Sequence, residues 1–137
     1  MSLTKRNAEI IREFTRTFKN EHNVDGIGHL FAADFVHHFK GPVRPGLDGF
    51  EDMGRMMNTA FPDVVVTEED LIVTDNKVVE RSSAVATHRA GLMGEPPTNK
   101  QVRWTEIHIY RLKDGKIAEH WVEFSLLELL RQIGAVK

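Results

Sequence analysis

The first third of the chain carries hydrophobic residues at helical spacing. They are Ile10, Ile11, Phe14 and Phe18, which lie on one side of a helix. This spacing predicts a helix over residues 4–20, with Thr4 as its capping residue. A second short helix is predicted over residues 24–31 and a third over residues 47–60, with a short strand over residues 34–39 between them.

Beyond Phe61 the hydrophobic period changes from helical to extended. Strands are predicted over residues 64–73, 77–89, 102–112 and 116–124, and a last helix over residues 126–133. Helices followed by a run of antiparallel strands are typical of an α+β domain. Long strands twist and curl, so we expect a cone-shaped, curved antiparallel sheet, wrapped by the N-terminal helices, in one domain over residues 1–137.

The pair Asp114-Gly115 is a strong signal for a two-residue hairpin turn. Counting back from this turn sets the predicted register of the two flanking strands. The predicted pairs on one face are Trp104 with Ser125, Glu106 with Glu123, His108 with Trp121 and Tyr110 with Glu119. The opposite face would pair Thr105 with Phe124, Ile107 with Val122 and Ile109 with His120. One face is therefore aromatic and ionisable, and the other is mostly apolar.

The aromatic and ionisable face is typical of a ligand pocket, in which apolar walls surround a few polar groups. In the predicted register Glu106 and Glu123 repel each other, which raises the pKa of at least one carboxyl group. A carboxyl pKa closer to neutrality suits a general acid or base. The alternative is a solvent-exposed outer face on which water screens both glutamates.

Two further segments could reach the same pocket. His37 and His38 are adjacent on a predicted strand, so their side chains point to opposite faces and at most one of them lines the pocket. Of the two, His38 is a candidate substrate-binding residue; the alternative for either is a hydrogen-bonded, half-buried histidine. Met57 either packs its helix against the sheet or forms an adaptable pocket wall.

Composition narrows the functional classes. The chain has 137 residues, of which 41% are hydrophobic and 28% charged, as is usual for a globular protein. Its net charge of −2 argues against a nucleic-acid partner. The absence of cysteine excludes disulfides and a thiol nucleophile. None of the seven histidines has a metal-site spacing such as HExxH, so we predict no metal site.

The sequence gives no signal for export or membrane insertion. Residues 1–9 are mostly polar and charged, and no apolar segment of a signal peptide follows them. No apolar run approaches the length of a membrane span. We therefore expect a cytoplasmic protein that does not bind membranes.

Several segments, in order along the chain, resemble one known family. They are Asp34-Phe35-Val36-His37-His38, Pro45-Gly46-Leu47-Asp48-Gly49-Phe50, Phe61-Pro62-Asp63, Gly94-Glu95-Pro96-Pro97-Thr98, the stretch from Asp114 to Trp121, and that from Leu129 to Ala135. Together they resemble the SnoaL-like polyketide cyclase (ester cyclase) family. The resemblance implies the fold of nuclear transport factor two and ketosteroid isomerase, which is a curved sheet around a pocket, and frequent homodimers.

The resemblance also implies an activity, with one departure from the family pattern. Characterised members close a ring of a polyketide ester by intramolecular aldol condensation, with acid–base residues and no cofactor. Ser125 stands where the family usually has an acid–base aspartate, and a serine hydroxyl needs an activating partner to serve as a base. Glu123 lies one pleat away, and Glu106 and His108 lie opposite in the predicted register, so these residues could take over the proton transfer.

Three hypotheses for the function remain open. The first is a cofactor-independent enzyme acting on a small apolar carbonyl compound, with Glu123 or Glu106 as the base and His108 as a donor. The residues predicted to contact its substrate are Trp104, Trp121, Tyr110, Ser125, His38 and Met57. The second is a binding or sensing module without catalysis, and the third is a dimeric scaffold with a filled core. All three predict a homodimer through the apolar face of Ile107, Ile109, Val122 and Phe124, because such a face should not remain in water.

Overall fold

The computed structural model describes residues 1–39 and 41–137, and it confirms the predicted α+β fold. Five strands form one curved sheet in the order β1-β5-β4-β3-β2. The strands are β1 (Phe31–His38), β2 (Val65–Val73), β3 (Lys77–Thr87), β4 (Gln101–Lys113) and β5 (Lys116–Phe124). The α-helices are α1 (Leu3–Phe14), α2 (Gly46–Ala60) and α3 (Leu126–Gln132).

The direction of β1 differs from the prediction. Strands β2 to β5 are antiparallel to their neighbours, as expected, but β1 runs parallel to β5. The sheet is therefore mixed. The expectation of a wholly antiparallel sheet was wrong for β1 because this strand pairs with the last strand of the chain, so no short turn fixes its direction.

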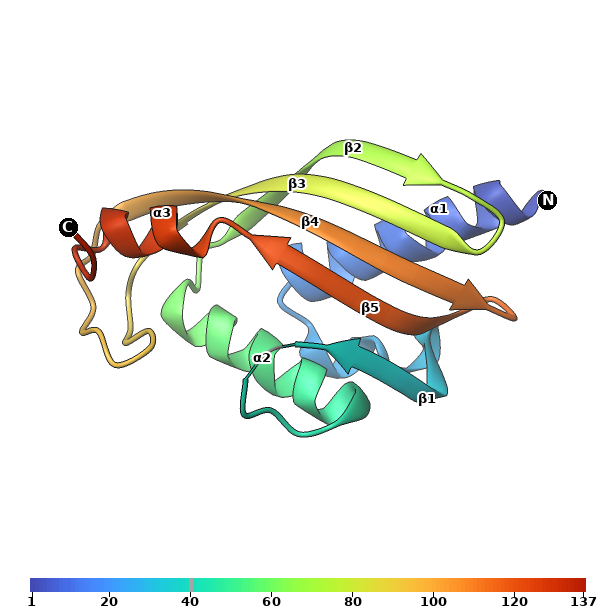
Figure 1. Cartoon of the computed structure of the whole chain (residues 1–137), viewed down its shortest axis with the longest axis horizontal. Coiled ribbons are helices and arrows are strands. Elements are labelled where there is room, and N and C mark those ends of the chain that lie inside the picture. The colour runs from blue at the N-terminus through green and yellow to red at the C-terminus, as the bar shows by residue number, and fades with distance from the viewer. Residues whose placement is uncertain (40) are drawn as a thin grey trace.

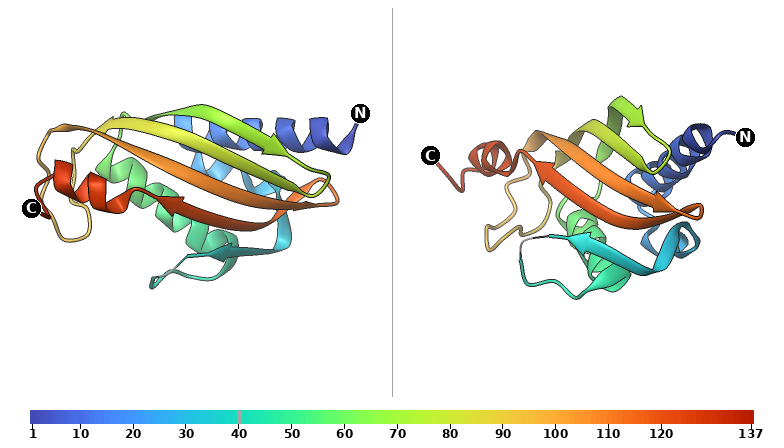
Figure 2. Two further views of the ribbon diagram at one scale, coloured as in Figure 1. Left: turned by 45° about the horizontal axis from the view of Figure 1, so that its top comes forward. Right: turned by 45° about the vertical axis from the view of Figure 1, so that its right-hand side comes forward.

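Helices α1 and α2 lie against the same face of the sheet, which we call the inner face (Figure 1). The sheet bends around them, and the two termini lie at opposite ends of the molecule in every view (Figure 2). Alternate residues of each strand point to this face, as the pleat requires. On β4, for example, Val102, Trp104, Tyr110 and Leu112 are buried, whereas Arg103, Thr105 and Ile107 are exposed on the outer face.

Two separate apolar cores lie on the inner face. The first joins α1 and α2 to one end of the sheet and consists mainly of Ile11, Phe14, Phe18, Phe31, Phe35, Phe50, Val78, Tyr110 and Leu112. The second lies under the other end and includes Phe61, Val66, Ala84, Val102, Trp104, Leu129 and Ile133. The stretch of sheet between them is lined by polar side chains.

The first predicted helix changes its geometry halfway. Helix α1 ends at Phe14 and continues as a π-helix over Thr15–Asn20, and it is Ser2, not Thr4, that caps its start through Lys5 N–H. The predicted helix over residues 24–31 consists of two short 3₁₀ turns, Val24–Gly26 and Gly28–Leu30. Two glycines within seven residues disfavour a longer helix there.

The last hairpin has the predicted turn but not the predicted register. Asp114 and Gly115 both have positive φ, as a two-residue turn of this kind requires, and Lys113 pairs with Lys116. A β-bulge then adds one extra residue, Ala118, to β5. From this point on, every residue of β5 faces the opposite side of the sheet from the one predicted, because side chains alternate along a strand.

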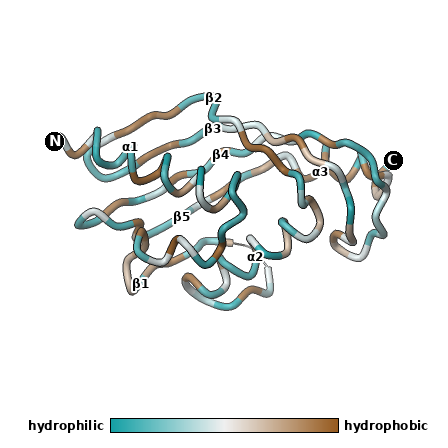
Figure 3. Tube along the Cα trace, turned by 180° about the vertical axis from the view of Figure 1, so that it is seen from behind, coloured by the Kyte–Doolittle hydropathy of each residue, from teal (hydrophilic) through white to brown (hydrophobic). Residues whose placement is uncertain are grey.

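Hydrophobic and hydrophilic residues alternate in short stretches along the helices and strands, as Figure 3 shows. Across residues 1–39 and 41–137, none of the helices combines the length and the hydropathy that a membrane crossing needs.

Gly49 allows the close contact between α2 and the loop that precedes it. A Cβ atom at this buried position would lie 1.7 Å from the backbone oxygen of Arg44. We therefore expect Gly49→Ala to lower the free energy of unfolding by about 1–3 kcal/mol, measured by urea denaturation. Gly28→Ala is the control, because nothing lies within 4 Å of its added Cβ. Equal losses in both variants would contradict this account of α2 packing.

Candidate functional site

The polar stretch between the two cores is built by paired residues of β3 and β4. Glu80 pairs with His108, and Ser82 pairs with Glu106. Glu80 and Ser82 are fully buried, and His108 is 6% exposed. Burial of ionisable side chains is costly unless they are paired or hydrogen-bonded, so their contacts explain how this stretch is tolerated.

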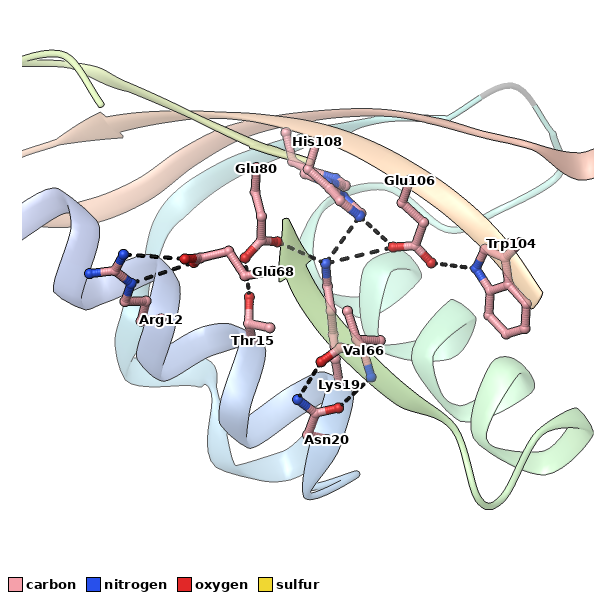
Figure 4. A network of polar contacts seen from close by, with 11 residues as sticks. Arg12, Thr15, Lys19, Asn20, Val66, Glu68, Glu80, Trp104, Glu106 and His108 are labelled. Carbon is pink, nitrogen blue, oxygen red and sulfur yellow. Dashed lines mark hydrogen bonds and ion pairs between the residues drawn. The ribbon is translucent and has the colours of Figure 1, made fainter. Parts of the chain in front are cut away.

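Glu106 is held by its two neighbours on the inner face of β4 (Figure 4). Its Oε1 lies 2.6 Å from Nε2 of His108, and its Oε2 accepts a hydrogen bond of 2.6 Å from the indole N–H of Trp104. The three side chains alternate along one strand and therefore share a face. The carboxylate is fixed at both oxygens between an imidazole and an indole.

The π-helix brings a cation to this cluster. Lys19 Nζ lies 3.1 Å from Glu80 Oε1, 3.7 Å from Glu106 Oε1 and 3.0 Å from His108 Nε2. Thr15, one turn earlier, donates a hydrogen bond of 2.8 Å to the other oxygen of Glu80. One ammonium group therefore lies between two carboxylates that come from neighbouring strands.

Three histidines continue the cluster toward β1. Nδ1 of His108 lies 2.8 Å from Nε2 of His120, and Nδ1 of His120 lies 3.0 Å from Nδ1 of His37. Successive rings are stacked, with both pairs of centroids 5.1 Å apart. The other ring nitrogen of His37, Nε2, lies 3.4 Å from the sulfur of Met53 on α2.

Burial and neighbouring charge shift the pKa values of these groups downwards. Burial lowers the pKa of His37 to about 4 and the pKa of His120 well below its usual value, with help from neighbouring histidines. Burial and the charge of Lys19 also lower the pKa of His108. For Glu106, burial raises the pKa, but the hydrogen bond from His108 and the charge of Lys19 outweigh it and hold the pKa well below its usual range. At neutral pH, Glu106 is ionised and the three histidines are neutral.

The cluster forms part of the wall of a cavity of about 1230 Å³. Its polar lining includes Lys19, His37, Glu106, His108 and His120. The apolar lining includes Phe18, Phe50, Met53, Met56, Met57, Phe61, Val64, Leu92, Trp104, Val122, Phe124 and Leu129. A large apolar cavity with a few convergent polar groups has the usual anatomy of a small-molecule site. Within residues 1–39 and 41–137, no group of three or more His, Asp or Glu side chains is arranged to hold a metal ion.

Seven of the nine predicted site residues line this cavity. Glu106, His108, Trp104 and Met57 all contribute to its lining. Tyr110 does not: it is fully buried in the first core, and burial, together with the charge of Glu80, raises the pKa of its phenol well above the usual value. Its hydroxyl has no hydrogen-bond partner among the described residues.

The bulge at Ala118 separates other predicted residues from the cluster. Glu106 pairs with Phe124, not with Glu123, which is exposed and pairs with Ile107 on the outer face. The predicted repulsion between Glu106 and Glu123 was therefore wrong. Residue 123 still borders the cavity, but its side chain belongs to the opposite face.

Trp121, His38 and Ser125 also lie outside the cluster. Residues 121 and 38 border the cavity, but their side chains stack on each other, with centroids 4.9 Å apart, and His38 Nε2 contacts Glu119 at 2.5 Å. Ser125 Oγ accepts the backbone N–H of Thr105 at 2.9 Å and so fixes the end of β5. It has a structural contact where the family pattern has an acid.

Lys19 and Glu80 were not predicted as site residues, and His120 was predicted on the wrong face of the sheet. Lys19 directly follows the apolar stripe of the first helix, and Glu80 follows two valines in a predicted strand. Neither pattern indicates that the two side chains meet. Ile117 and Ala118 are consecutive apolar residues at the bulge, but so are Trp121 and Val122 in the regular part of the strand, so this pattern does not locate the bulge.

A family model for the SnoaL-like polyketide cyclases matches residues 9–133. The chain belongs to this family. No curated protein matches the sequence.

Solved structures share the fold over nearly the whole chain. TsrD from Streptomyces laurentii is 26% identical, with a TM-score of 0.87 over 96% of this chain and 97% of that chain. AclR from Streptomyces galilaeus, a candidate hydroxylase, is 26% identical, with a TM-score of 0.87 over 99% and 89%. IdmH from Streptomyces antibioticus, a candidate polyketide cyclase, is 28% identical, with a TM-score of 0.79 over 93% and 97%.

The ion pair of Lys19 and Glu80 can be tested by a double-mutant cycle. Lys19→Met leaves the buried Glu80 carboxylate without its cation, so we expect the free energy of unfolding to fall by about 3–5 kcal/mol. The double variant Lys19→Met/Glu80→Gln should recover a large part of this loss, because the unpaired charge is gone. Urea denaturation of the unmodified protein, Lys19→Met, Glu80→Gln and the double variant measures the coupling free energy between the two side chains. Simple additivity of the two substitutions would contradict the pairing.

Proposed function

We propose that this SnoaL-like chain is a cofactor-independent enzyme that performs acid–base chemistry on a small, largely apolar carbonyl compound. The observation that carries the proposal is the Glu106–His108 pair in the wall of a large, mostly apolar cavity. Two titratable groups in hydrogen-bond contact, with pKa values shifted by burial and by charge, are typical of sites that transfer protons.

Aldol ring closure is the reaction that this geometry supports best. The reaction needs a base to remove a proton next to a carbonyl group and donors to stabilise the enolate that forms. Glu106 orients His108, and the ammonium of Lys19 supplies positive charge beside the pair. An enolate conjugated with further carbonyl groups needs no external electron sink. Isomerisation and dehydration use the same proton transfers and are the next candidates.

The cavity favours a ligand of more than one ring. Its volume of about 1230 Å³ lies above the range of about 300–1,000 Å³ that is usual for small-molecule sites. Apolar and aromatic side chains dominate its lining, which suits an aromatic or polyene skeleton. IdmH is described as a candidate polyketide cyclase, which agrees with such a substrate. AclR is described as a candidate hydroxylase, so one fold can host different chemistry.

Ser125 favours a second function, a binding or sensing module without turnover. Its hydroxyl is engaged with the backbone of Thr105, so it offers no acid at the position where the family usually has one. Such a module would bind apolar carbonyl compounds and release them unchanged. Detection of a ring-closed product would exclude it; because ring closure leaves the mass unchanged, the product must be separated from the substrate by chromatography before mass spectrometry.

The role of the Glu106–His108 pair can be tested with Glu106→Gln on aromatic keto-esters. Loss of the charge removes the partner that orients His108, so we expect kcat to fall by about 100-fold or more. Chromatography that separates the product from the isomeric substrate measures the rate. Glu123→Gln is the matched control, because this exposed glutamate on the outer face of the sheet should tolerate the change. Full activity of Glu106→Gln on a substrate that the unmodified protein converts would refute the assignment.

The predicted homodimer requires a corrected surface. Val122 and Phe124 pair with His108 and Glu106 and so lie on the inner face, which overturns half of the predicted apolar face. We propose instead that the outer face pairs two copies. Ile107 is 48% exposed there, and Ile109 lies between Val79 and Trp121 in the register. A scaffold function would use the same surface.

Sedimentation equilibrium at micromolar concentrations tests this surface. We expect a dimer for the unmodified chain and a monomer for Ile107→Lys, because a buried, unpaired charge disfavours the contact. Leu3→Lys, on α1, is the control and should remain dimeric, although Leu3 is similarly exposed at 47%. A monomer at high micromolar concentration for the unmodified chain would contradict the proposed dimer.

A further inference from the structure

We propose that His37, His120 and His108 form a proton relay, in which His37 is the base that contacts the substrate and Glu106 anchors the far end. This inference rests on the proposed acid–base function and deepens it. It assigns a catalytic role to His37, on β1, and a proton-transfer role to His120, on β5. The geometric basis is an unbroken line of ring nitrogens from the carboxylate to Met53.

Hydrogen-bond counting gives the relay a direction. An ionised carboxylate only accepts, so Nε2 of His108 carries the proton that bonds to Glu106 at 2.6 Å. A neutral imidazole has one N–H, so Nδ1 of His108 accepts from Nε2–H of His120. By the same rule, Nδ1 of His120 accepts from Nδ1–H of His37. Nε2 of His37 is then left as a bare lone pair.

The reverse direction conflicts with the ionised state of Glu106. It would place the proton of His37 on Nε2, where the Met53 sulfur is a weak acceptor, but it would leave Nε2 of His108 without a proton. A lone pair would then face the carboxylate at 2.6 Å. Lys19 could donate to that nitrogen at 3.0 Å, but its bond would not relieve the contact with Glu106. In the proposed direction both groups are donors, so this contact is not a hydrogen bond and the ammonium donates to Glu80 instead.

The free end of the relay faces the cavity. His37 is half-buried, whereas His108 and His120 are 6% and 1% exposed, so His37 is the most accessible ring of the three. His37 and Met53 both line the cavity. The stacked and tilted rings of Phe35 and Phe50 hold His37 in place. Met53 Sδ lies 3.4 Å from Nε2 of His37, so a substrate carbon reaches this nitrogen when the flexible Met53 side chain moves aside.

The charged groups around the relay favour movement of a positive charge toward Glu106. From β1 only His38 adds charge near His37, and it lowers the pKa of His37 further. At the far end, Glu106 and Glu80 stabilise a protonated His108, while Lys19 opposes it. Tyr110 stays neutral because burial raises its pKa. A cation on His108 is hydrogen-bonded to a carboxylate, which a cation on His37 is not.

In the proposed step, one proton enters the relay from the substrate and two further protons move from one histidine to the next. Nε2 of His37 takes a proton from the substrate carbon, and the electron pair stays on the substrate as an enolate. The Nδ1 proton of His37 passes to Nδ1 of His120, and the Nε2 proton of His120 passes to Nδ1 of His108. His108 becomes an imidazolium paired with the Glu106 carboxylate. After carbon–carbon bond formation, the product alkoxide takes the proton back from His37, and the relay returns to its starting state.

Nitrogen-15 NMR of histidine-labelled protein at pH 7 tests the direction without any substrate. We expect His108 and His120 to carry their proton on Nε2, and His37 on Nδ1. The two-bond coupling pattern of each ring distinguishes these tautomers. A proton on Nε2 of His37 or on Nδ1 of His120 would overturn the proposed direction, whatever the enzyme does.

Kinetics of variants test the function of the relay. His120→Gln interrupts the relay but leaves Glu106 and His37 in place, so we expect kcat to fall by about 100-fold with KM little changed. His37→Ala should lose a similar factor and regain part of it with added imidazole, which a purely structural role would not allow. His29→Gln, at an exposed histidine paired with Glu13, is the control and should keep full activity.

Two outcomes separate the relay from the proposed function. If Glu106→Gln loses activity but His120→Gln keeps it within twofold, the relay is wrong and the acid–base function stands. If the folded, unmodified protein converts no aromatic keto-ester, the proposed function fails, and the relay fails with it as a catalytic device. Loss of activity in His120→Gln, combined with the expected tautomers, supports both.

Discussion

The structure depends on one buried charge arrangement, that of Lys19 between Glu80 and Glu106. Glu80 is fully buried, and each carboxylate alone would be strongly destabilising between two apolar cores. The π-helix at Thr15–Asn20 directs Thr15 and Lys19 toward Glu80, and π-helical turns often mark functional sites. Apolar side chains here would avoid the free-energy cost of burying charged groups. The polar side chains between the two cores therefore favour a catalytic role over a stabilising one.

The β-bulge at Ala118 is the second structural determinant of the site. It turns His120 to the inner face, beside His108, and turns Glu123 to the outer face. The predicted register placed two glutamates opposite each other. With the one extra residue of the bulge, the structure instead places a line of histidines next to one glutamate. The electrostatic consequence is a reversal: the pKa of Glu106 is lowered by His108 and Lys19, not raised by a second carboxylate.

These residues lie on the fold that the chain shares with the SnoaL-like polyketide cyclase family. Relatives of the same fold are described as a candidate cyclase and a candidate hydroxylase, so the scaffold does not determine the reaction. Ser125 is tied to the end of β5, and the ionisable residues of the cluster that line the cavity lie instead on the π-helix, β1, β4 and β5.

The sequence by itself determined the α+β class, the hairpin turn at Asp114-Gly115 and the family, because hydrophobic period, turn residues and short motifs are local signals. It also placed Trp104, Glu106 and His108 on one face, since alternation within one strand needs no partner. Only the tertiary structure decided the parallel entry of β1, the bulge at Ala118 and the meeting of Lys19 with Glu80. These features join residues far apart in the chain, and their geometry follows from packing and buried charge, which no local pattern records.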